Sequence, residues 1–402
     1  MRITRVVGAS AISLLVFGLV LPREAFGLPV FARKYRVSCA LCHNPFPALT
    51  PFGDQFAANG FRMAIEEPPR DTIATGDELL TLPAGLPLAL RLDAYAQLYA
   101  NGNAATDFQL PFNLKLLSGG TLSKKLSYYI YFLLAERGEV AGIEDAFIQW
   151  NDIGNAPVDL VFGQFQVSDP MFKRELRLEV QDYAIYKVLV GLQPANLTYD
   201  RGFMASADLA GFTLTASVVN GDGIPASNDL LRYDNDANKN VFGHLSRDVG
   251  GHVRLGLMGY TGRQNGDAYG FPDQSNAITM WGADATLGTG AFELNLQYIS
   301  RNDTEADFIP GEPVVDTDGG FAELLVRPAG SRWYGYGLYN YIEASAPVLN
   351  VKLGTPVGLS QYESIAVGGG YLVYRNFRLY GEYGFEFERD LNRVTAGITT
   401  AF

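Results

Sequence analysis

Cysteine and histidine are scarce in this sequence: its 402 residues include two cysteines and three histidines. Both cysteines and one histidine fall in a single run, Cys39-Ala40-Leu41-Cys42-His43. A zinc site would need a second pair of ligands, and no other cysteine exists. A thioredoxin-like disulfide would lie between a strand and a helix of a βαβ unit, and no such unit is visible. The spacing favours one covalently attached haem c, held by Cys39 and Cys42.

Long apolar runs are also missing after the N-terminus, where no stretch approaches the ~20 residues of a membrane-spanning helix. The first residues differ: Arg2 and Arg5 precede the apolar stretch 6–21, and small residues follow at Ala25-Phe26-Gly27. This pattern predicts a secretory signal peptide over residues 1–27. A retained anchor is the alternative, but the run is short for a span. Export agrees with haem attachment, which takes place outside the cytoplasm.

Basic residues are outnumbered, and the net charge of −12 argues against a nucleic-acid partner. The chain is nevertheless 48% hydrophobic, with 44 glycines, 22 tyrosines and 25 phenylalanines. Apolar and aromatic residues without long apolar runs are typical of a β-rich protein.

From Leu88 onward, apolar and polar residues alternate with the period of a strand. Leu88, Leu90 and Leu92 share one face, while Arg91 and Asp93 share the other. A soluble sandwich or a solenoid also alternates, but many segments here run to about ten residues, the length that crosses a bilayer at a tilt. Residues 88–402 are thus predicted to form an all-β, porin-like transmembrane barrel of about 16 antiparallel strands in the outer membrane.

The connections between the expected strands alternate in length. Tight turns are expected at Ala210-Gly211, Val249-Gly250 and Arg375-Asn376, and the links between them are long. Short turns on the periplasmic side and long loops outside are the rule in such barrels, which places both termini in the periplasm. By the same alternation, Phe108, Leu110 and Phe112 are expected together on the lipid-facing side.

Residues 28–70 are too few for an independent globular core. They are predicted to form a small α-helical, monohaem cytochrome c-like plug inside the barrel lumen, followed by an extended linker over 71–87. Pro and Gly mark the ends of a helix near 51–60. Phe52 and Phe56 fall on one face of that helix and, with Phe61, are candidates to cover the porphyrin. They also suit packing against the barrel wall.

The haem iron needs axial ligands. His43 is the expected proximal ligand, because the attachment motif brings its imidazole to the metal. Met63 is the candidate distal ligand, although it also suits simple apolar packing. The alternative distal ligands are His244 and His252, because their strands place Val241, Leu245, Leu255 and Leu257 toward lipid and both histidines toward the lumen.

The N-terminal part resembles a known family. Phe31-Ala32-Arg33-Lys34-Tyr35, the Cys39–His43 run, Pro51-Phe52-Gly53 and Asn59-Gly60-Phe61-Arg62-Met63 are similar to the signature of outer-membrane cytochrome–porin fusion proteins. The resemblance covers residues 29–63, and it extends to the barrel only in architecture and length. It implies an iron-oxidase-like oxidoreductase that passes electrons from extracellular Fe(II) to a periplasmic cytochrome c or copper protein.

Three functions stay open at this stage. The first is oxidation of Fe(II) or a similar extracellular donor, and the second is the same conduit run outward to an extracellular acceptor. The third is a solute-selective porin with a haem-bearing plug. Two acidic stretches are candidates to attract a cation, since carboxylates suit hard cations; acidic loops also serve solubility. Their residues are Asp222, Asp229, Asp234 and Asp236, and Asp303, Glu305, Asp307, Glu312, Asp316 and Asp318.

Overall fold

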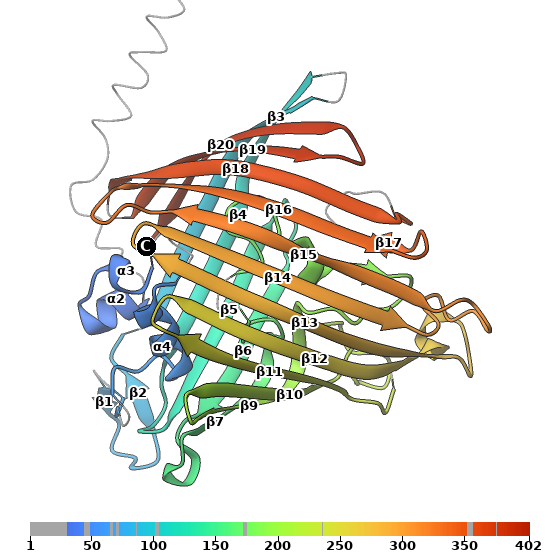
Figure 1. The fold of residues 1–402 in the computed structure, drawn as a ribbon. Helices are drawn as coiled ribbons and strands as arrows, with labels where there is room; N and C mark the ends of the chain where they lie inside the picture. Colours follow the sequence, from blue (N-terminus) through green and yellow to red (C-terminus); the bar gives the residue numbers. More distant parts are fainter. Residues whose placement is uncertain are drawn as a thin grey trace, which may run out of the picture.

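The computed structural model describes residues 30–43, 49–64, 67–69, 72–85, 87–100, 104–171, 175–234, 236–351, 357–374 and 376–402. These residues form a long closed β-barrel, with short helices gathered at one of its mouths (Figure 1). In the described part of the chain, no helix is both long and apolar enough to span a membrane. The expected signal peptide lies outside the described residues.

Sixteen antiparallel strands close the barrel, and the first of them, β3, pairs with the last, β20. The strand number and class are those expected from the alternation. Many of the strands exceed ten residues, as expected. The strands are β3 Leu88–Ala100, β4 Ala104–Thr121, β5 Leu126–Glu136, β6 Gly142–Trp150, β7 Val158–Gln166, β9 Tyr199–Leu209, β10 Phe212–Val219, β11 Asn240–Val249, β12 Val253–Asn265, β13 Ser275–Thr289, β14 Phe292–Asp303, β15 Val315–Val326, β16 Trp333–Ala344, β18 Gln361–Tyr374, β19 Phe377–Glu386 and β20 Leu391–Ala401.

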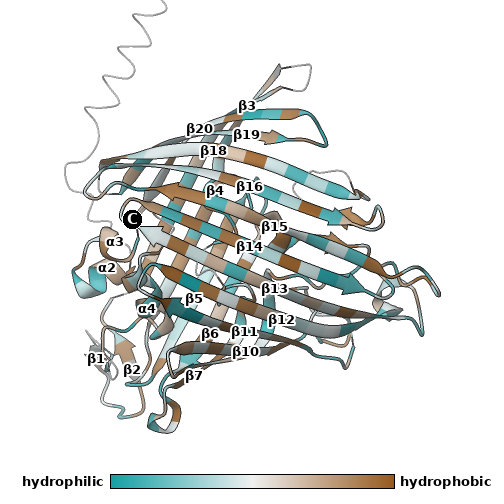
Figure 2. Ribbon diagram, in the orientation of Figure 1, coloured by the Kyte–Doolittle hydropathy of each residue, from teal (hydrophilic) through white to brown (hydrophobic). Residues whose placement is uncertain are grey.

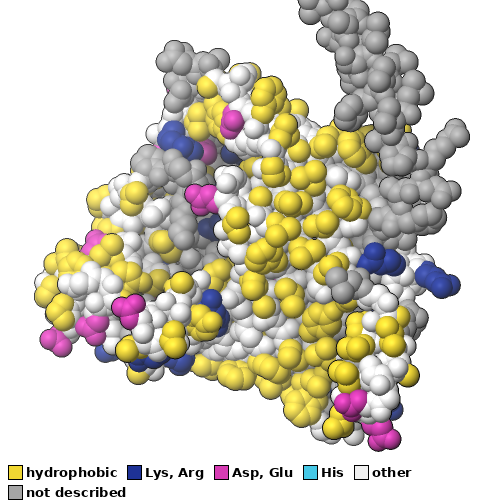
Figure 3. Space-filling view, turned by 180° about the vertical axis from the view of Figure 1, so that it is seen from behind, with side chains coloured by type: hydrophobic (Ala, Val, Ile, Leu, Met, Phe, Trp, Pro, Cys, Tyr) yellow, Lys and Arg dark blue, Asp and Glu magenta, His cyan; other side chains and the backbone are white. Residues whose placement is uncertain are grey.

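Hydrophilic and hydrophobic residues alternate along many of these strands, as the banded colouring of the ribbon shows (Figure 2). On β3, Arg91 and Asp93 are buried inside the barrel, whereas Leu98 is 42% exposed on the outer face. Apolar side chains cover the middle of the outer wall, and charged ones gather toward its ends (Figure 3). An apolar outer band on a closed antiparallel barrel is the arrangement that meets lipid, and the protein is therefore an outer-membrane barrel.

One part of the predicted alternation is wrong. Phe112 was expected on the lipid side with Phe108, but its side chain is 2% exposed and stacks on Tyr95 inside the barrel. The register between β3 and β4 shifts between Asp93 and Tyr95, so β4 carries extra residues around Pro111. Proline cannot donate to the ladder and is found at such bulges. Phe112 turns inward within the bulge, whereas Asn113 and Lys115 beyond it are buried in the lumen as the alternation predicts.

The two ends of the barrel differ. Short turns such as Ala210-Gly211 close the end at which the C-terminus lies, and long connections leave the other end. This asymmetry agrees with the prediction and identifies the short-turn end as periplasmic. One long connection, residues 304–314, also reaches over the lumen, because the amide of Gln193 donates to the Ala306 carbonyl at 2.8 Å.

The lumen is filled by the connection between β7 and β9. Residues 167–198, here called the inner loop, fold back into the barrel and carry the short helix α5 Ala184–Lys187 and the two-residue strand β8 Leu189–Val190. Strand β8 pairs with β17 Leu349–Asn350, which belongs to another long connection. Most described inner-loop side chains are buried. The predicted occupant of the lumen, the N-terminal segment, is therefore not the one that fills it.

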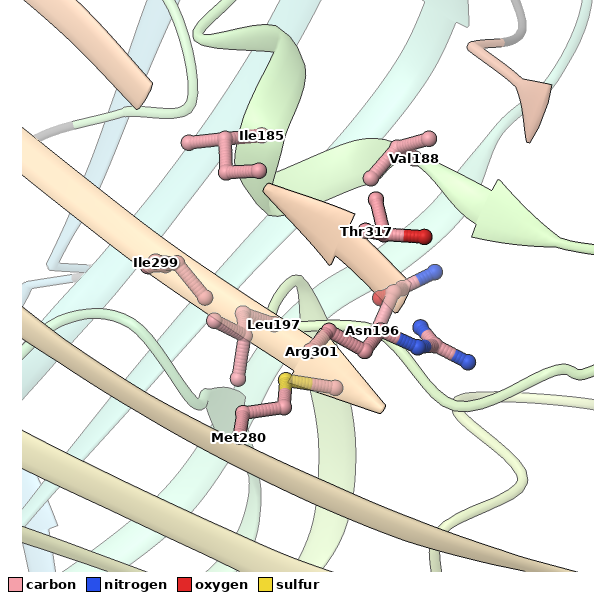
Figure 4. Close-up of a pocket in the computed structure, with 8 residues that line it drawn as sticks. All are labelled: Ile185, Val188, Asn196, Leu197, Met280, Ile299, Arg301 and Thr317. Carbon is pink, nitrogen blue, oxygen red and sulfur yellow. The ribbon is translucent and has the colours of Figure 1, made fainter. Parts of the chain in front are cut away.

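An apolar core joins the inner loop to the barrel wall. Inner-loop residues such as Leu197 and Ile185 pack with wall residues Met280 and Ile299 in a single buried cluster. Figure 4 shows where they meet, around a cavity of about 10 Å³. That volume holds about one water molecule.

Ion pairs and hydrogen bonds tie the inner loop to strands on several sides of the barrel. The Glu175 carboxylate accepts from Arg91 on β3 at 2.8 Å and from Lys115 on β4 at 2.7 Å. Glu179 accepts from Arg378 on β19, which is two strands from β3, at 2.8 Å. On the opposite wall, the Ala195 carbonyl of the inner loop accepts from Arg301 on β14 at 2.8 Å. The inner loop therefore bridges the lumen instead of lining one wall.

The N-terminal helices are α2 Val30–Tyr35, α3 Cys39–Cys42 and α4 Pro51–Ala58. They form the predicted small helical unit, but they dock at the periplasmic mouth, on β4 to β6 (Figure 1). The residues predicted as an extended linker contain a short hairpin of β1 Thr72–Ala74 and β2 Thr81–Pro83.

Candidate functional site

The cysteine motif occupies one helical turn. Cys39 and Cys42 are the first and last residues of α3, which places both side chains on the same side of the turn, and neither forms a disulfide. The Ser38 hydroxyl caps the turn by accepting from the Ala40 amide at 3.3 Å. Burial raises the pKa of both thiols, so they stay protonated at neutral pH.

Two residues of the next helix hold this turn. Thr50 caps α4, and its hydroxyl also donates to the Leu41 carbonyl at 2.7 Å. Gly53 lies so close to Cys42 that a β-carbon at position 53 would stand 2.2 Å from the Cys42 carbonyl oxygen. Any larger residue would push the two helices apart, and this explains the glycine of the Pro51-Phe52-Gly53 motif.

The aromatic residues that were predicted to cover a porphyrin lie on α4 or directly after it. Phe56 is buried and meets Phe31 and Tyr35 edge to face, with ring centroids 5.3 and 5.5 Å apart. Phe61 stacks on Phe31. Phe52 differs, because it stacks on Phe56 but remains 37% exposed. The segment thus has an inner aromatic core and leaves one ring open to a flat apolar group.

Gly60 and Arg62 anchor the segment to the barrel. Gly60 has a φ of +61°, and a β-carbon there would lie 2.4 Å from the Ser127 hydroxyl of β5. Arg62 is 1% exposed, and its guanidinium donates to the carbonyls of Asn59 and Lys124, both at 2.9 Å. In the sequence, both residues belong to the Asn59–Met63 motif and Gly60 marks the end of the expected helix, but neither pattern predicts their contacts with the barrel.

Glu67 is a second anchor that the sequence analysis missed. Its buried carboxylate accepts from the Tyr35 hydroxyl at 2.9 Å and from the Met63 amide at 2.9 Å, and it pairs with Lys34 at 3.4 Å. Its own amide donates to the Lys124 carbonyl. A carboxylate directly before Pro68-Pro69 carries no sequence pattern that would identify it.

The candidate distal ligands lie in different places. Met63 is 38% exposed within the N-terminal segment. His244 points inward as predicted and is 1% exposed, but its Nε2 lies 2.8 Å from the Asp284 carboxylate on β13. His252 was also predicted to face the lumen, but it is exposed in the turn between β11 and β12, with Nδ1 3.2 Å from the Gly288 carbonyl. The partners of both histidines, Asp284 and Gly288, belong to β13 and not to the motif.

The acidic residues do not converge. Asp303 pairs with Arg301 inside the barrel, whereas Asp318 accepts from Tyr298 on the outer face. In the other stretch, Asp234 pairs with Lys239. No cluster of three or more potential metal-ligating His, Cys, Asp or Glu residues occurs among the described residues.

The residues around α3 fit a covalently attached haem. Two free thiols on one side of a turn, followed directly by His43, are the donor set that such a haem needs. The half-exposed ring of Phe52, on the helix packed against the motif, offers an apolar surface for a porphyrin. The thiols would hold the group, and His43 would supply the proximal nitrogen.

Solved structures show which class of barrel this is. The anion-selective porin from Comamonas acidovorans is similar with a TM-score of 0.54 and 12% identity, covering 79% of this chain and 99% of that chain. The trimer form of OmpT, an outer membrane protein of Vibrio cholerae, matches with a TM-score of 0.53 and 13% identity over 78% of this chain and 98% of that chain. The protein therefore has the fold of an outer-membrane porin.

A third structure gives the same result. The outer membrane channel DcaP of Acinetobacter baumannii has a TM-score of 0.53 and 11% identity, covering 78% of this chain and 96% of that chain. No family model matches the sequence, and no curated protein matches it. At these identities, the likeness concerns the barrel fold alone.

Proposed function

We propose that this protein is an outer-membrane electron conduit. A c-type haem bound by Cys39 and Cys42 at the periplasmic mouth would exchange electrons between an extracellular donor, Fe(II) or a similar one-electron reductant, and a periplasmic carrier. The observation that carries the proposal is the turn of two free thiols, held by Thr50 and Gly53 at the barrel mouth. When bound, haem supplies a reversible one-electron couple at its iron.

The packing of the lumen also supports transfer of electrons over diffusion of solutes. The inner loop shares an apolar core with strands from β10 to β18. Ion pairs from Glu175 and Glu179 then hold it against β3, β4 and β19. Electrons cross packed protein, whereas hydrated solutes need an aqueous path.

The residues of the N-terminal segment have separate tasks in this proposal. Cys39 and Cys42 bind the porphyrin covalently, and His43 ligates the iron, while Met63 is the candidate for its other side. Phe52 and Phe56 exclude water from one face. Arg62 and Glu67 hold the segment against the barrel, so that the redox site keeps a fixed distance from the wall.

The first test is attachment of haem to the full chain, exported by cells that mature c-type cytochromes. Purified wild-type protein should keep its haem after denaturation, with a c-type absorption spectrum. Replacing both Cys39 and Cys42 by serine should abolish this signal and leave the barrel folded. Wild-type protein without covalent haem would overturn the proposal.

The second test fixes the direction of transfer. Protein in liposomes that enclose an oxidised cytochrome c should reduce this carrier when Fe(II) is added on the side of the long loops. Liposomes that enclose reduced cytochrome c, with Fe(III) added outside, test electron transfer in the outward direction. A faster outward reaction under matched driving force would support delivery to an extracellular acceptor.

A diffusion porin is the second candidate function, favoured by the likeness of the barrel to the anion-selective porin and to DcaP. In that case the N-terminal segment and the inner loop would act as a gate, and haem would have at most a structural part. Liposome swelling separates the two functions. Rapid swelling with small sugars would favour the porin, and impermeable liposomes that still reduce the enclosed carrier would favour the conduit.

A further inference from the structure

Four aromatic rings form a continuous stack from the N-terminal segment into the barrel. Phe31 on α2 stacks on Phe61 with ring centroids 4.8 Å apart and planes inclined by 4°. Phe61 stacks on Tyr129 of β5 at 4.7 Å and 16°, and Tyr129 stacks on Tyr131 at 6.3 Å and 22°. The first two rings belong to the segment that carries the cysteine motif, and the last two belong to the barrel wall.

The stack ends at the inner loop. The Tyr131 hydroxyl donates to the Glu175 carboxylate at 2.6 Å, and Glu175 pairs with Arg91 and Lys115. The stack therefore joins the haem motif's segment to the polypeptide that crosses the lumen.

We propose that the stack Phe31–Phe61–Tyr129–Tyr131 is the electronic contact between the N-terminal segment and the lumen. This inference rests on the proposed function and adds the residues that would carry the electron. An external Fe(II) is oxidised to Fe(III), and its electron crosses the stacked rings to the haem iron, which goes from Fe(III) to Fe(II). No proton moves and no bond forms in this step.

The rings serve as a bridge and are not themselves oxidised. The Lys115 ammonium lies 5.1 Å from the centroid of Tyr131, and a cation over an aromatic face disfavours removal of an electron from the ring. Electron transfer between closely stacked rings covers shorter distances than transfer through empty space or across aliphatic side chains. Removing the central ring, Tyr129, would leave Phe61 and Tyr131 without their shared neighbour.

Docking alone does not explain this geometry. Within the N-terminal segment, Phe56 meets Phe31, Tyr35 and Phe61 edge to face, with interplanar angles of 79°, 89° and 75°. Edge-to-face contacts pack as well as stacked ones. One near-parallel series leads into the barrel, whereas the other near-parallel pair, Phe52 and Phe56, stays within the segment. The anchoring contacts of Arg62 and Gly60 are made with other wall residues.

The test uses the full-length holoprotein in liposomes and compares Tyr129→Leu with Tyr129→Phe. Stopped-flow reduction of the haem by Fe(II), added on the side of the long loops, should slow on the order of ten-fold in the leucine variant, equivalent to about 1.4 kcal/mol in the barrier. The phenylalanine variant keeps the ring and should match the wild type. Tyr95→Leu is the matched control, because Tyr95 is a buried lumen ring stacked on Phe112, outside this series.

Two further measurements separate conduction from docking. The haem midpoint potential and hydrogen–deuterium exchange over residues 51–64 should be unchanged in Tyr129→Leu. Tyr131→Leu is the second variant, because it leaves the Phe61–Tyr129 contact in place and should slow reduction similarly. The Tyr131 ring is therefore tested without disturbing the docked segment.

The outcomes are distinct. Wild-type rates in Tyr129→Leu and Tyr131→Leu would overturn the inference and leave the proposed function intact. Faster exchange over 51–64 in Tyr129→Leu, with a wild-type rate in Tyr131→Leu, would also overturn it, because the ring would then act only in docking. A haem-loaded wild type that external Fe(II) does not reduce would overturn both.

Discussion

The pairing of Glu175 with two buried cations predicts that a single substitution loosens the inner loop. In Glu175→Gln the side chain keeps its shape but loses its charge. Arg91 retains Asp93 at 3.0 Å, whereas the ammonium of Lys115, which is almost fully buried, loses the carboxylate 2.7 Å away. Breaking a buried ion pair costs about 3–5 kcal/mol. Because glutamine still accepts hydrogen bonds, we expect the substitution to destabilise the seated inner loop by about 3 kcal/mol. This corresponds to a shift of roughly a hundred-fold in the equilibrium toward the displaced loop.

The assay is ion conductance of the purified protein in a planar lipid bilayer. Glu175→Gln should show open-channel events far more often than the wild type, because displacement of the inner loop opens the lumen. Glu139→Gln is the matched control, since Glu139 is exposed in the turn between β5 and β6. Adding Lys115→Met to Glu175→Gln should restore much of the closed state by removing the uncompensated charge. Equal conductance in Glu175→Gln and Glu139→Gln would refute this reasoning.

Three further predictions concern the anchors and the pH dependence. Arg62→Ala removes the guanidinium donor of the Asn59 carbonyl and one of the two donors of the Lys124 carbonyl, and should weaken docking by about 1–3 kcal/mol. Amide exchange over 51–64 should become faster, whereas Arg33→Ala, which loses one exposed bond, should not change it. Burial raises the pKa of Glu179 to about 7, so the seated inner loop favours the protonated carboxyl. The stabilisation of the seated loop by this residue is therefore full below its ordinary pKa of 4.5 and is lost as the pH rises through 7. Bilayer conductance should therefore rise between pH 5 and 8, and Glu179→Gln should remove this dependence. Gly53→Ala should lower the yield of covalent haem relative to Gly85→Ala, where a β-carbon meets open space.

Acid should act on the inner loop through other carboxylates. Burial acts to raise the pKa of Glu175, but the charges of Arg91 and Lys115 outweigh it and hold the pKa well below its usual range. The stabilisation from this residue is therefore present above its ordinary pKa of 4.5 and is lost as the pH falls toward strong acid. It therefore changes little between pH 5 and 8.

The barrel could be predicted from sequence because its evidence is local and repeated. The alternation within β3 alone predicts that Arg91 and Leu98 lie on opposite faces, and no information about the neighbouring strands is needed. The prediction failed at Phe112, which lies among the extra residues around Pro111 and turns inward, while the alternation resumes at Asn113. A bulge depends on the register with the partner strand, and a single strand read by itself does not contain that register.

The inner loop and the docked segment were harder to predict, because their contacts join distant parts of the chain. Glu179 pairs with Arg378, and Arg62 reaches the Lys124 carbonyl. Neither alternation nor composition shows that a loop will turn into the lumen. The Cys39–His43 spacing identified the candidate site, whereas its place at the mouth of the barrel depends on Gly60 meeting Ser127.

The position of the docking surface has a consequence for the order of assembly. The N-terminal segment lies on β4, β5 and β6, on one side of the seam between β20 and β3, where Val394 pairs with Leu98. Consecutive hairpins form from local contacts, and the seam joins the two ends of the barrel sequence. We therefore expect the surface that receives the segment to be complete before the last strand pairs. If a haem is attached to the segment as proposed, it could be in place while the barrel is still open.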